Sequence, residues 1–461
     1  MRPWGVAISV PDRRPPDPTG PQAQGRAGRL RRLVGLANPV TDRVRLLSLV
    51  EQALLSLANF LGLLLLARHF RTTEFGMFSF AYLSLMLIVN VQRSLVVVPF
   101  IIHAAETDQL AREGRLWRKL NMLVTVCCTA ILGMASGLTA AVGGPGWLAL
   151  AWLAAAIFVP ASFVYEFFRR WAIQRHEYRR TVAAAGSYLV LFGSGTLIAV
   201  HLHSLPAAVA AFFAANAGAA LMCRPRPMAE LPGPGFRAFL DDVAHFLGWS
   251  LLSNLAYNGY YYLPPLILGG LAGPLPVAVF QAMRNFSQPL NMLGTAVDNF
   301  DKPRAARAMV RHGVDGMWRQ LLRTTGAMAV LGTPYMLVLV FFGHELIDLV
   351  YAQKYGDHVV VLHLWVLWHV LSMAAYPLET GLFVTRRPNL LFRGRIVAAA
   401  IGIATTAALA ASLGVVGAML GLISGTAVSA IVAFHYLRRV RREADAERAT
   451  PDDGATERVR G

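Results

Sequence analysis

The chain has 461 residues, of which 55% are hydrophobic and 15% are charged, and its mean hydropathy is +0.47. This balance excludes an ordinary soluble domain and predicts an all-α polytopic membrane protein. The formal net charge is +17. The three cysteines show neither a disulfide framework nor metal-ligand spacing, so we expect no metal or other cofactor.

Residues 1–41 are rich in Pro and Arg, and we interpret them as a disordered, basic cytoplasmic tail. Their first apolar run is too short for the core of a signal peptide. An arginine-rich, acid-poor start is also typical of a transit peptide, but five prolines in positions 11–21 would break the amphipathic helix that such a peptide requires.

About twelve stretches after this tail are long and apolar enough to be transmembrane helices. They form two six-helix lobes, an N-lobe at 42–223 and a C-lobe at 241–436. A cytoplasmic linker rich in Pro and Gly joins them at 224–240, and a charged cytoplasmic tail follows at 437–461. The predicted spans lie near 44–67, 75–101, 119–142, 147–168, 181–201, 204–223, 243–268, 275–298, 321–343, 358–384, 393–413 and 415–436.

The two lobes begin alike, which indicates an internal repeat. Each opens with Leu-Leu-Ser, at 54–56 and at 251–253, followed by an Asn and an apolar run. An offset of about 200 residues gives both lobes the same orientation, which is a transporter architecture. The match is short, and two apolar helices of similar composition also resemble each other by chance.

Lys and Arg are concentrated in alternate loops. Both tails and the loops after the even-numbered spans hold 37 of the 43 basic residues, whereas the other loops hold only Arg68, Arg71 and Lys354. Because basic loops stay on the cytoplasmic side, both termini are predicted to be cytoplasmic. The positive charge then reflects topology and attraction to membrane lipids, and no nucleic-acid partner is expected.

The first two predicted helices of each lobe carry polar side chains in rows at helical spacing. Single Asn, Ser, Gln or Tyr residues often only hydrogen-bond neighbouring helices. A continuous row instead predicts the wall of a hydrophilic cavity between the lobes. The longest row lies in 275–298 and consists of Gln281, Arg284, Gln288, Asn291, Thr295 and Asp298. Further candidates for such a wall are Gln52, Asn59, Arg93, Asn254, Asn258 and Tyr261.

Charged side chains at membrane depth must face protein or water, because each costs at least about 2.5–3.5 kcal/mol at a helix centre. Glu51 and Arg93 lie at matching depth, which predicts an ion pair of structural or functional use. Arg284 lies near the middle of its span. Its counter-ion is predicted to be either a phosphate of a bound molecule or an acid such as Glu166 or Glu379.

Prolines mark where these helices are expected to bend. Pro289 interrupts the span at 275–298, and Pro264–Pro265 stand near the end of the preceding span. Proline removes a helical hydrogen bond, so kinks or breaks are predicted there. Such bends serve either a conformational change or packing alone.

Two segments carry a resemblance to a known family. Residues 46–82 place Gln, Ser and Asn in the first span, an Arg after it, and Glu-Phe-Gly at the start of the next, at Gln52, Ser56, Asn59, Arg68, Glu74, Phe75 and Gly76. This pattern resembles the opening of Wzx-type polysaccharide-biosynthesis flippases of the multidrug/oligosaccharidyl-lipid/polysaccharide (MOP) superfamily. Residues 337–367 are similar to the family's apolar helix, Phe-Gly and external amphipathic segment, and the resemblance covers about 44–436.

The resemblance implies a V-shaped, alternating-access carrier and not an enzyme. Its cargo would be a polyprenyl-pyrophosphate-linked oligosaccharide, moved across the bacterial inner membrane for O-antigen or exopolysaccharide biosynthesis. Arg284 and Arg93 would engage the pyrophosphate, and Glu51 and Asp298 would couple transport to protons or sodium. Polysaccharide polymerases would be partners. The predicted cavity is less basic than a pyrophosphate carrier requires, which is a departure from the family pattern.

Other functions fit parts of the same pattern. A cation-coupled multidrug antiporter of the same superfamily would use an aromatic pocket and a carboxylate, for which Tyr260–Tyr262 and Glu51 are candidates. A lipid II flippase usually has extra helices. A glycosyltransferase or an O-antigen polymerase would need acid/base groups in external loops, and the longest one, near 344–357, offers only Glu345, Asp348 and Asp357.

Overall fold

The computed structural model describes residues 39–103, 107–226, 231–385 and 388–449, and every described element is a helix. The chain divides into two units, Met1–Leu47 and Ser48–Gly461. Of the first, the described part is the helical start of α2. The predicted tail at 1–41 lies almost wholly outside the described residues.

The helices fall into two sets along the chain. The N-half consists of α2 (Pro39–His69), α3 (Thr72–Gln92), the π-helix η1 (Arg93–Val97), α4 (Val98–His103), α5 (Thr107–Ala141), α6 (Gly146–Gln174), α7 (Tyr178–His201) and α8 (Leu205–Met222). The C-half consists of α9 (Phe236–Ala272), α10 (Pro274–Phe286), α11 (Gln288–Phe341), α12 (Gly343–Tyr351), the 3₁₀ turn η2 (Gly356–His358), α13 (Val359–Val384), α14 (Pro388–Leu413) and α15 (Val415–Ala449). Thus α9 begins inside the predicted linker, and the predicted C-terminal tail starts as helix.

Ten of the described helical stretches are long and apolar enough to cross a membrane, and they match ten of the predicted spans. One of the two remaining spans falls on α9, where the apolar stretch is Phe246–Ala256. The other falls on α10, which has 13 residues, and on the start of α11. The all-helical membrane fold is therefore confirmed. The count of twelve, the lobe boundaries and the cytoplasmic termini stay predictions.

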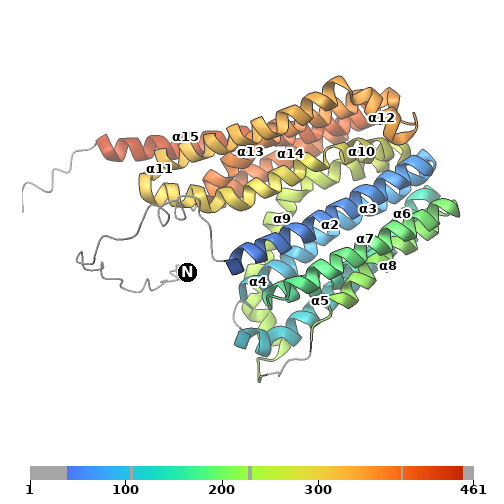
Figure 1. Ribbon diagram of the computed structural model, residues 1–461, viewed down its shortest axis with the longest axis horizontal. Coiled ribbons are helices and arrows are strands. Elements are labelled where there is room, and N and C mark those ends of the chain that lie inside the picture. Colours follow the sequence, from blue (N-terminus) through green and yellow to red (C-terminus); the bar gives the residue numbers. More distant parts are fainter. Residues whose placement is uncertain (1–38, 104–106, 227–230, 386–387, 450–461) are drawn as a thin grey trace, which may run out of the picture. The chain divides into compact units, whose positions relative to one another are not determined.

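Within Ser48–Gly461, the helices of each half pack mainly on one another (Figure 1). In the N-half, α6 contacts α3, α5, α7 and α8; in the C-half, α13, α14 and α15 contact one another. Between the halves, α3 packs along α9 and α10, and α9 begins beside α5, where the rings of Phe239 and Trp117 lie 4.8 Å apart. Because α3 contacts helices of both halves, it holds the two halves together.

The predicted helix at 275–298 is broken at Ser287. The backbone N–H and the hydroxyl of Ser287 both donate to the carbonyl oxygen of Arg284, at 3.0 and 2.7 Å, and close α10. Pro289, which has no N–H, stands in the first turn of α11. The predicted polar row is therefore split over two helices. In contrast, α9 continues through Pro264–Pro265.

The basic loop predicted between residues 298 and 321 is helical. α11 runs through it to Phe341 and kinks at Gly313, where φ is 62°. Apolar residues recur there at helical spacing between the basic ones, so one face can be buried. They form a small core with α13 and α15 that contains Ala305, Val314, Met317, Leu321, Leu382, Ala433, Leu437 and Val440.

Gly76 sets how closely α3 approaches α10. A Cβ atom at this position would lie 2.0 Å from the backbone oxygen of Pro274, the first residue of α10. A backbone oxygen cannot rotate away as the end of a side chain can. Any side chain at residue 76 therefore requires the two helices to separate.

We expect Gly76→Ala to lower the midpoint of thermal unfolding in detergent by several degrees, because overpacking forces a shift of the backbone. Gly133→Ala on α5 is the matched control, since a Cβ there meets nothing within 4 Å. The control should be unchanged or slightly more stable, because Ala is the better helix former. Equal midpoints for Gly76→Ala and wild type would contradict the close approach.

A second contact between the halves lies at the end of the bundle that carries few basic residues. Nη1 of Arg68 donates to the carbonyl oxygens of Leu349 and Val350, at 2.9 and 3.1 Å. These carbonyls end α12, where the helix dipole attracts a cation. In return Nζ of Lys354 donates to the carbonyls of Arg68 and, at 3.0 Å, Phe70. Partial burial lowers the pKa of Lys354. We call these contacts the latch.

Candidate functional site

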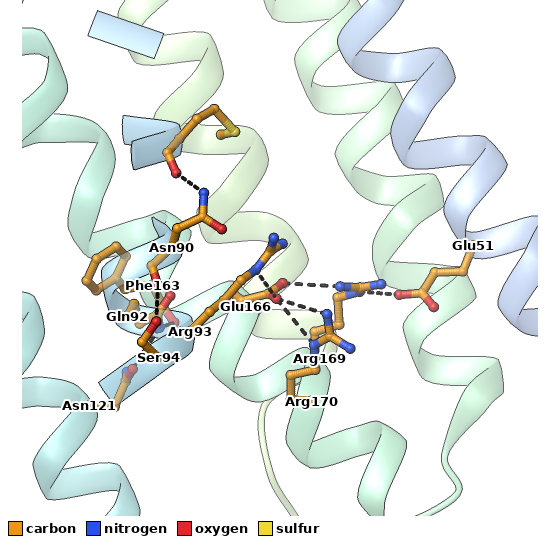
Figure 2. A network of polar contacts seen from close by, with 11 residues as sticks. Glu51, Asn90, Gln92, Arg93, Ser94, Asn121, Phe163, Glu166, Arg169 and Arg170 are labelled. Atoms are coloured by element: carbon orange, nitrogen blue, oxygen red, sulfur yellow. Dashed lines mark hydrogen bonds and ion pairs between the residues drawn. The ribbon is translucent and has the colours of Figure 1, made fainter. Parts of the chain in front are cut away.

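Five charged side chains of the N-half form one network (Figure 2). Oε1 of Glu166 accepts hydrogen bonds from Nε of Arg93 and from Nε and Nη2 of Arg170, each at 3.2 Å. Oε2 of Glu166 accepts from Nη1 of Arg169 at 3.1 Å, and Nε of Arg169 also bonds to Glu51. Glu51, Glu166 and Arg169 are buried, so the network joins α2, η1 and α6 inside the N-half.

The predicted ion pair between Glu51 and Arg93 does not form. Glu51 pairs with Arg169, and Arg93 pairs with Glu166. The prediction was wrong because the predicted span at 147–168 ends one residue before Arg169. α6 continues to Gln174 and carries this side chain into the bundle, where it takes the place expected for Arg93.

Arg93 is the most exposed member of the network. Its side chain is 43% exposed, against 10% for Glu166. Arg93 begins the π-helix η1, and π-turns change the direction of side chains along a helix and occur often at functional sites. The preceding Gln92 is fixed, because its amide donates to Oδ1 of Asn121 and to the carbonyl of Phe163, both at 2.8 Å. Three arginines against two glutamates leave one positive charge.

A cavity of about 270 Å³ lies within the C-half, lined by residues of α9, α10, α11, α13 and α15. Its aromatic wall contains Tyr260, Tyr261, Tyr262, Trp368 and Tyr376. Its polar wall contains Asn258, Arg284, Gln288, Asn291, Ser372 and Glu379. The cavity thus combines aromatic rings with amides and hydroxyls, and its described lining includes one basic and one acidic side chain.

Arg284 is held against aromatic rings. Its guanidinium carbon lies 5.0 Å from the ring centroid of Tyr261 and 5.6 Å from that of Tyr262. The residue is 8% exposed, and its Nε has no hydrogen-bond partner in the described part of the chain. The negative faces of the rings offset part of the cost of removing a cation from water. They do not neutralise its charge.

Neither acid considered from the sequence pairs with Arg284. Glu166 belongs to the N-half network. Glu379 pairs with Nη2 of Arg395 at 2.7 Å and accepts a hydrogen bond from Ser429 at 3.1 Å. Among the described residues, no carboxylate forms an ion pair with Arg284. An anion that enters the cavity would meet a positive charge that no acid among the described side chains of the C-half balances.

Five of the nine binding residues predicted from the sequence line this cavity, namely Asn258, Tyr261, Arg284, Gln288 and Asn291. Asn254 lies one turn before Asn258 on α9 and accepts a hydrogen bond from its amide. These residues come together because α9 lies beside α10. Their role in binding stays a prediction.

The predicted residues of the N-half lie elsewhere. Gln52 is exposed on α2, and Oδ1 of Asn59 accepts a hydrogen bond from the hydroxyl of Tyr188 at 2.9 Å. Glu51 and Arg93 belong to the charge network. None of these residues lines the cavity of the C-half. A larger cavity between the halves, with α2 and α3 in its wall, stays a prediction.

The residues of the polar row at 281–298 also lie in different surroundings. Gln281 is fully buried, and its amide donates to Oδ1 of Asn285 at 3.1 Å. Gln281 therefore packs between helices and does not face the cavity. The side chain of Asp298, the second predicted coupling carboxylate, lies outside the described side chains.

The wall that α13 contributes is missing from the sequence prediction, apart from Glu379. Trp368, Ser372, Tyr376 and Glu379 follow one another at steps of 4, 4 and 3 residues, which is itself a helical row. The many Val, Leu and Ala residues around it keep the mean hydropathy of the span high, so the row does not stand out as polar. The indole N–H and hydroxyl groups of Trp and Tyr are the signal that could have found it.

The fold is that of transporters of the MOP superfamily. The chain superposes on an inward-facing multidrug resistance MATE family transporter with a TM-score of 0.66 and 15% identity, over 87% of this chain and 99% of that chain. For the lipid II flippase MurJ in an inward closed conformation, the TM-score is 0.67 at 10% identity, over 85% and 87%. For a MOP transporter from Pyrococcus furiosus with a binding pocket of reverse polarity, the TM-score is 0.59 at 14% identity, over 86% and 94%.

These identities show the fold alone, and a comparison with curated protein sequences finds no match. The family is identified from the amino-acid sequence. Residues 65–360, more than half of the chain, match the sequence profile of a family described as polysaccharide biosynthesis protein. This chain therefore belongs to the polysaccharide biosynthesis protein family.

Proposed function

We propose that this protein is a flippase, which carries a polyprenyl-pyrophosphate-linked oligosaccharide across the bacterial inner membrane for the synthesis of a surface polysaccharide. The observation that carries the proposal is Arg284, a buried cation whose charge no described carboxylate balances, in a cavity with amides and hydroxyls. A guanidinium matches a phosphate with its fork of donors. Membership in a polysaccharide biosynthesis family supports the same cargo.

Arg93 supplies a second cationic contact in this proposal. Its side chain is partly exposed, and its network carries one net positive charge. Glu51 and Glu166 offset the other arginines, which explains why the N-half is less basic than the arginine count suggests. Arg284 and Arg93 then offer one cation in each half to a cargo that carries two phosphates.

The latch supports alternating access. It ties the α2–α3 turn to the end of α12 at the end opposite the basic loops. This proposal assigns the basic loops to the cytoplasm, so the latch lies on the side where the cargo would leave. We propose that the cargo's head group enters from the cytoplasmic leaflet and that the latch opens for its release. A polysaccharide polymerase would receive it there.

Energy coupling is assigned to carboxylates in this proposal. Glu51 is buried and bound to Arg169, so binding of a cation at its carboxylate would change the charge balance of the network. An anionic cargo near Arg93 would compensate the added positive charge. Glu51 thereby offers a route by which protons or sodium ions couple to binding, with Asp298 as the second candidate.

A multidrug antiporter is the second candidate function, because the cavity has aromatic walls and one acid. Organic cations bind such sites through ring faces and a carboxylate. Here Arg395 neutralises Glu379, and Arg284 adds a positive charge to the wall. The charge of the cavity therefore favours an anionic cargo over a cationic drug.

The test is transport by the purified wild type in proteoliposomes of known orientation. We expect it to move a fluorescent polyprenyl-pyrophosphate-linked oligosaccharide between leaflets faster than protein-free liposomes do. The same vesicles should not expel a cationic dye when a proton gradient is imposed. Dye efflux without flipping of the lipid would replace the proposal with the antiporter.

A further inference from the structure

We infer that the cavity of the C-half is a sugar subsite, which holds one pyranose ring of the cargo and thereby selects which oligosaccharides are carried. The inference rests on the proposed function and adds a second recognition element to the cation Arg284. Three features of the cavity support it, namely its size, its fixed aromatic wall and its unpartnered polar groups.

The volume of about 270 Å³ limits what can enter. Pockets for drug-sized ligands measure about 300–1,000 Å³, so this one is at the small end of the range. It has room for one sugar ring and not for a whole oligosaccharide. The rest of the cargo must lie outside the C-half cavity.

The aromatic wall is fixed in place before any ligand binds. Nε1 of Trp368 donates to the hydroxyl of Thr426 at 2.8 Å, and its ring lies 5.4 Å from the rings of both Trp365 and Tyr261. A pyranose presents a face of C–H bonds that packs against an aromatic ring and a rim of hydroxyls that must find partners. Rigid rings bind such a face with little loss of side-chain freedom.

Two polar side chains of the wall have unused hydrogen-bonding capacity. Oγ of Ser372 is buried and has no hydrogen-bond partner among the residues that the structure describes, and the residue is 4% exposed. The amide of Gln288, at the start of α11, makes no hydrogen bond with any described residue. A buried polar group without a partner is unfavourable, because it has lost its hydrogen bonds to water. A sugar hydroxyl both donates and accepts, so it can satisfy either group.

Other classes of ligand would not form favourable contacts with every part of the cavity wall. An aliphatic ligand would leave Ser372 and Gln288 without partners, and an organic cation would approach Arg284. A sugar joined to a phosphate satisfies all three, with the phosphate at Arg284 and the ring against Trp368. This arrangement makes Gln288 and Ser372 residues that determine specificity for the cargo.

The test compares short lipid probes that differ by one sugar. Farnesyl pyrophosphate is titrated into the full-length protein in nanodiscs beside three conjugates that carry a single N-acetylglucosamine, glucose or galactose on the pyrophosphate. We expect at least one conjugate to bind wild type about ten times more tightly than farnesyl pyrophosphate, which corresponds to about 1.4 kcal/mol. The Ser372→Ala, Gln288→Leu double variant should lose this gain and keep the affinity for farnesyl pyrophosphate.

The controls separate the subsite from the proposed function. Ser412→Ala and Gln109→Leu change the same residue types at exposed positions on α14 and α5 and should keep the gain. If farnesyl pyrophosphate binds and no sugar improves its binding, or if the double variant keeps the gain, the cavity is filled by water and the subsite is refuted. If no probe binds wild type, the proposed function itself fails.

Discussion

Arg284→Ala is expected to slow flipping of the lipid-linked oligosaccharide by about 100-fold or more in proteoliposomes. Removing one member of a buried pair between a cation and a cargo phosphate costs about 2–5 kcal/mol, since the remaining charge stays without water or a partner. Arg284→Lys should retain part of the rate. Lysine keeps the positive charge but loses the fork of donors and the planar contact with the rings of Tyr261 and Tyr262.

Two further variants make this result interpretable. Arg284→Met keeps much of the side-chain volume without the charge, so a loss in both Met and Ala variants cannot be caused by an empty space alone. Arg439→Ala is the control, because this arginine is exposed at 70% and pairs with Glu443 on the surface of α15. Normal transport by folded Ala and Met variants would remove Arg284 from the site and return the polar row to helix packing.

The transmembrane spans could be predicted because a run of about 20 apolar residues seldom occurs outside a transmembrane helix. The prediction holds for ten spans. For 275–298 the sequence contains two conflicting signals, a polar row at the spacing of one continuous helix and a proline that predicts a kink or a break. Pro289 in the sequence indicates the break. In the structure, the hydroxyl of Ser287 ends α10 by donating a hydrogen bond to the carbonyl oxygen of Arg284. Whether the polar row or the proline decides the local structure depends on how the neighbouring helices pack, and a single sequence does not show this packing.

The candidate site could be predicted only on the helices that carry Asn, Gln and Arg. Arg284, Gln288 and Asn291 share a wall as their spacing suggests. Trp368 and Ser372 were missed because the span that carries them is strongly apolar. The pairing of Glu51 was missed for a different reason, since one residue at the end of a span decides whether Arg169 counts as loop or as core. The contact between α2 and α6 depends on tertiary packing, which the sequence pattern does not reveal.

Glu166→Gln is expected to have the largest effect on stability. Glu166 contacts three arginines, and removing the acid of a buried pair costs about 3–5 kcal/mol because the cations stay in place without it. The midpoint of unfolding in detergent should fall far more than in Glu443→Gln, whose partner Arg439 is exposed. Equal midpoints for the two variants would show that the network contributes nothing to folding.

Removing cations from the same network separates folding from transport. Arg170→Gln placed in the Glu166→Gln background removes a charge that has lost its partner, so it should recover part of the stability. Arg93→Gln alone should change stability little, because Arg93 is the most exposed member and Glu166 keeps two other guanidinium partners. If Arg93→Gln nevertheless slows flipping, its guanidinium acts on the cargo; if it unfolds the protein as Glu166→Gln does, Arg93 is a structural residue and Arg284 alone carries the cationic contact.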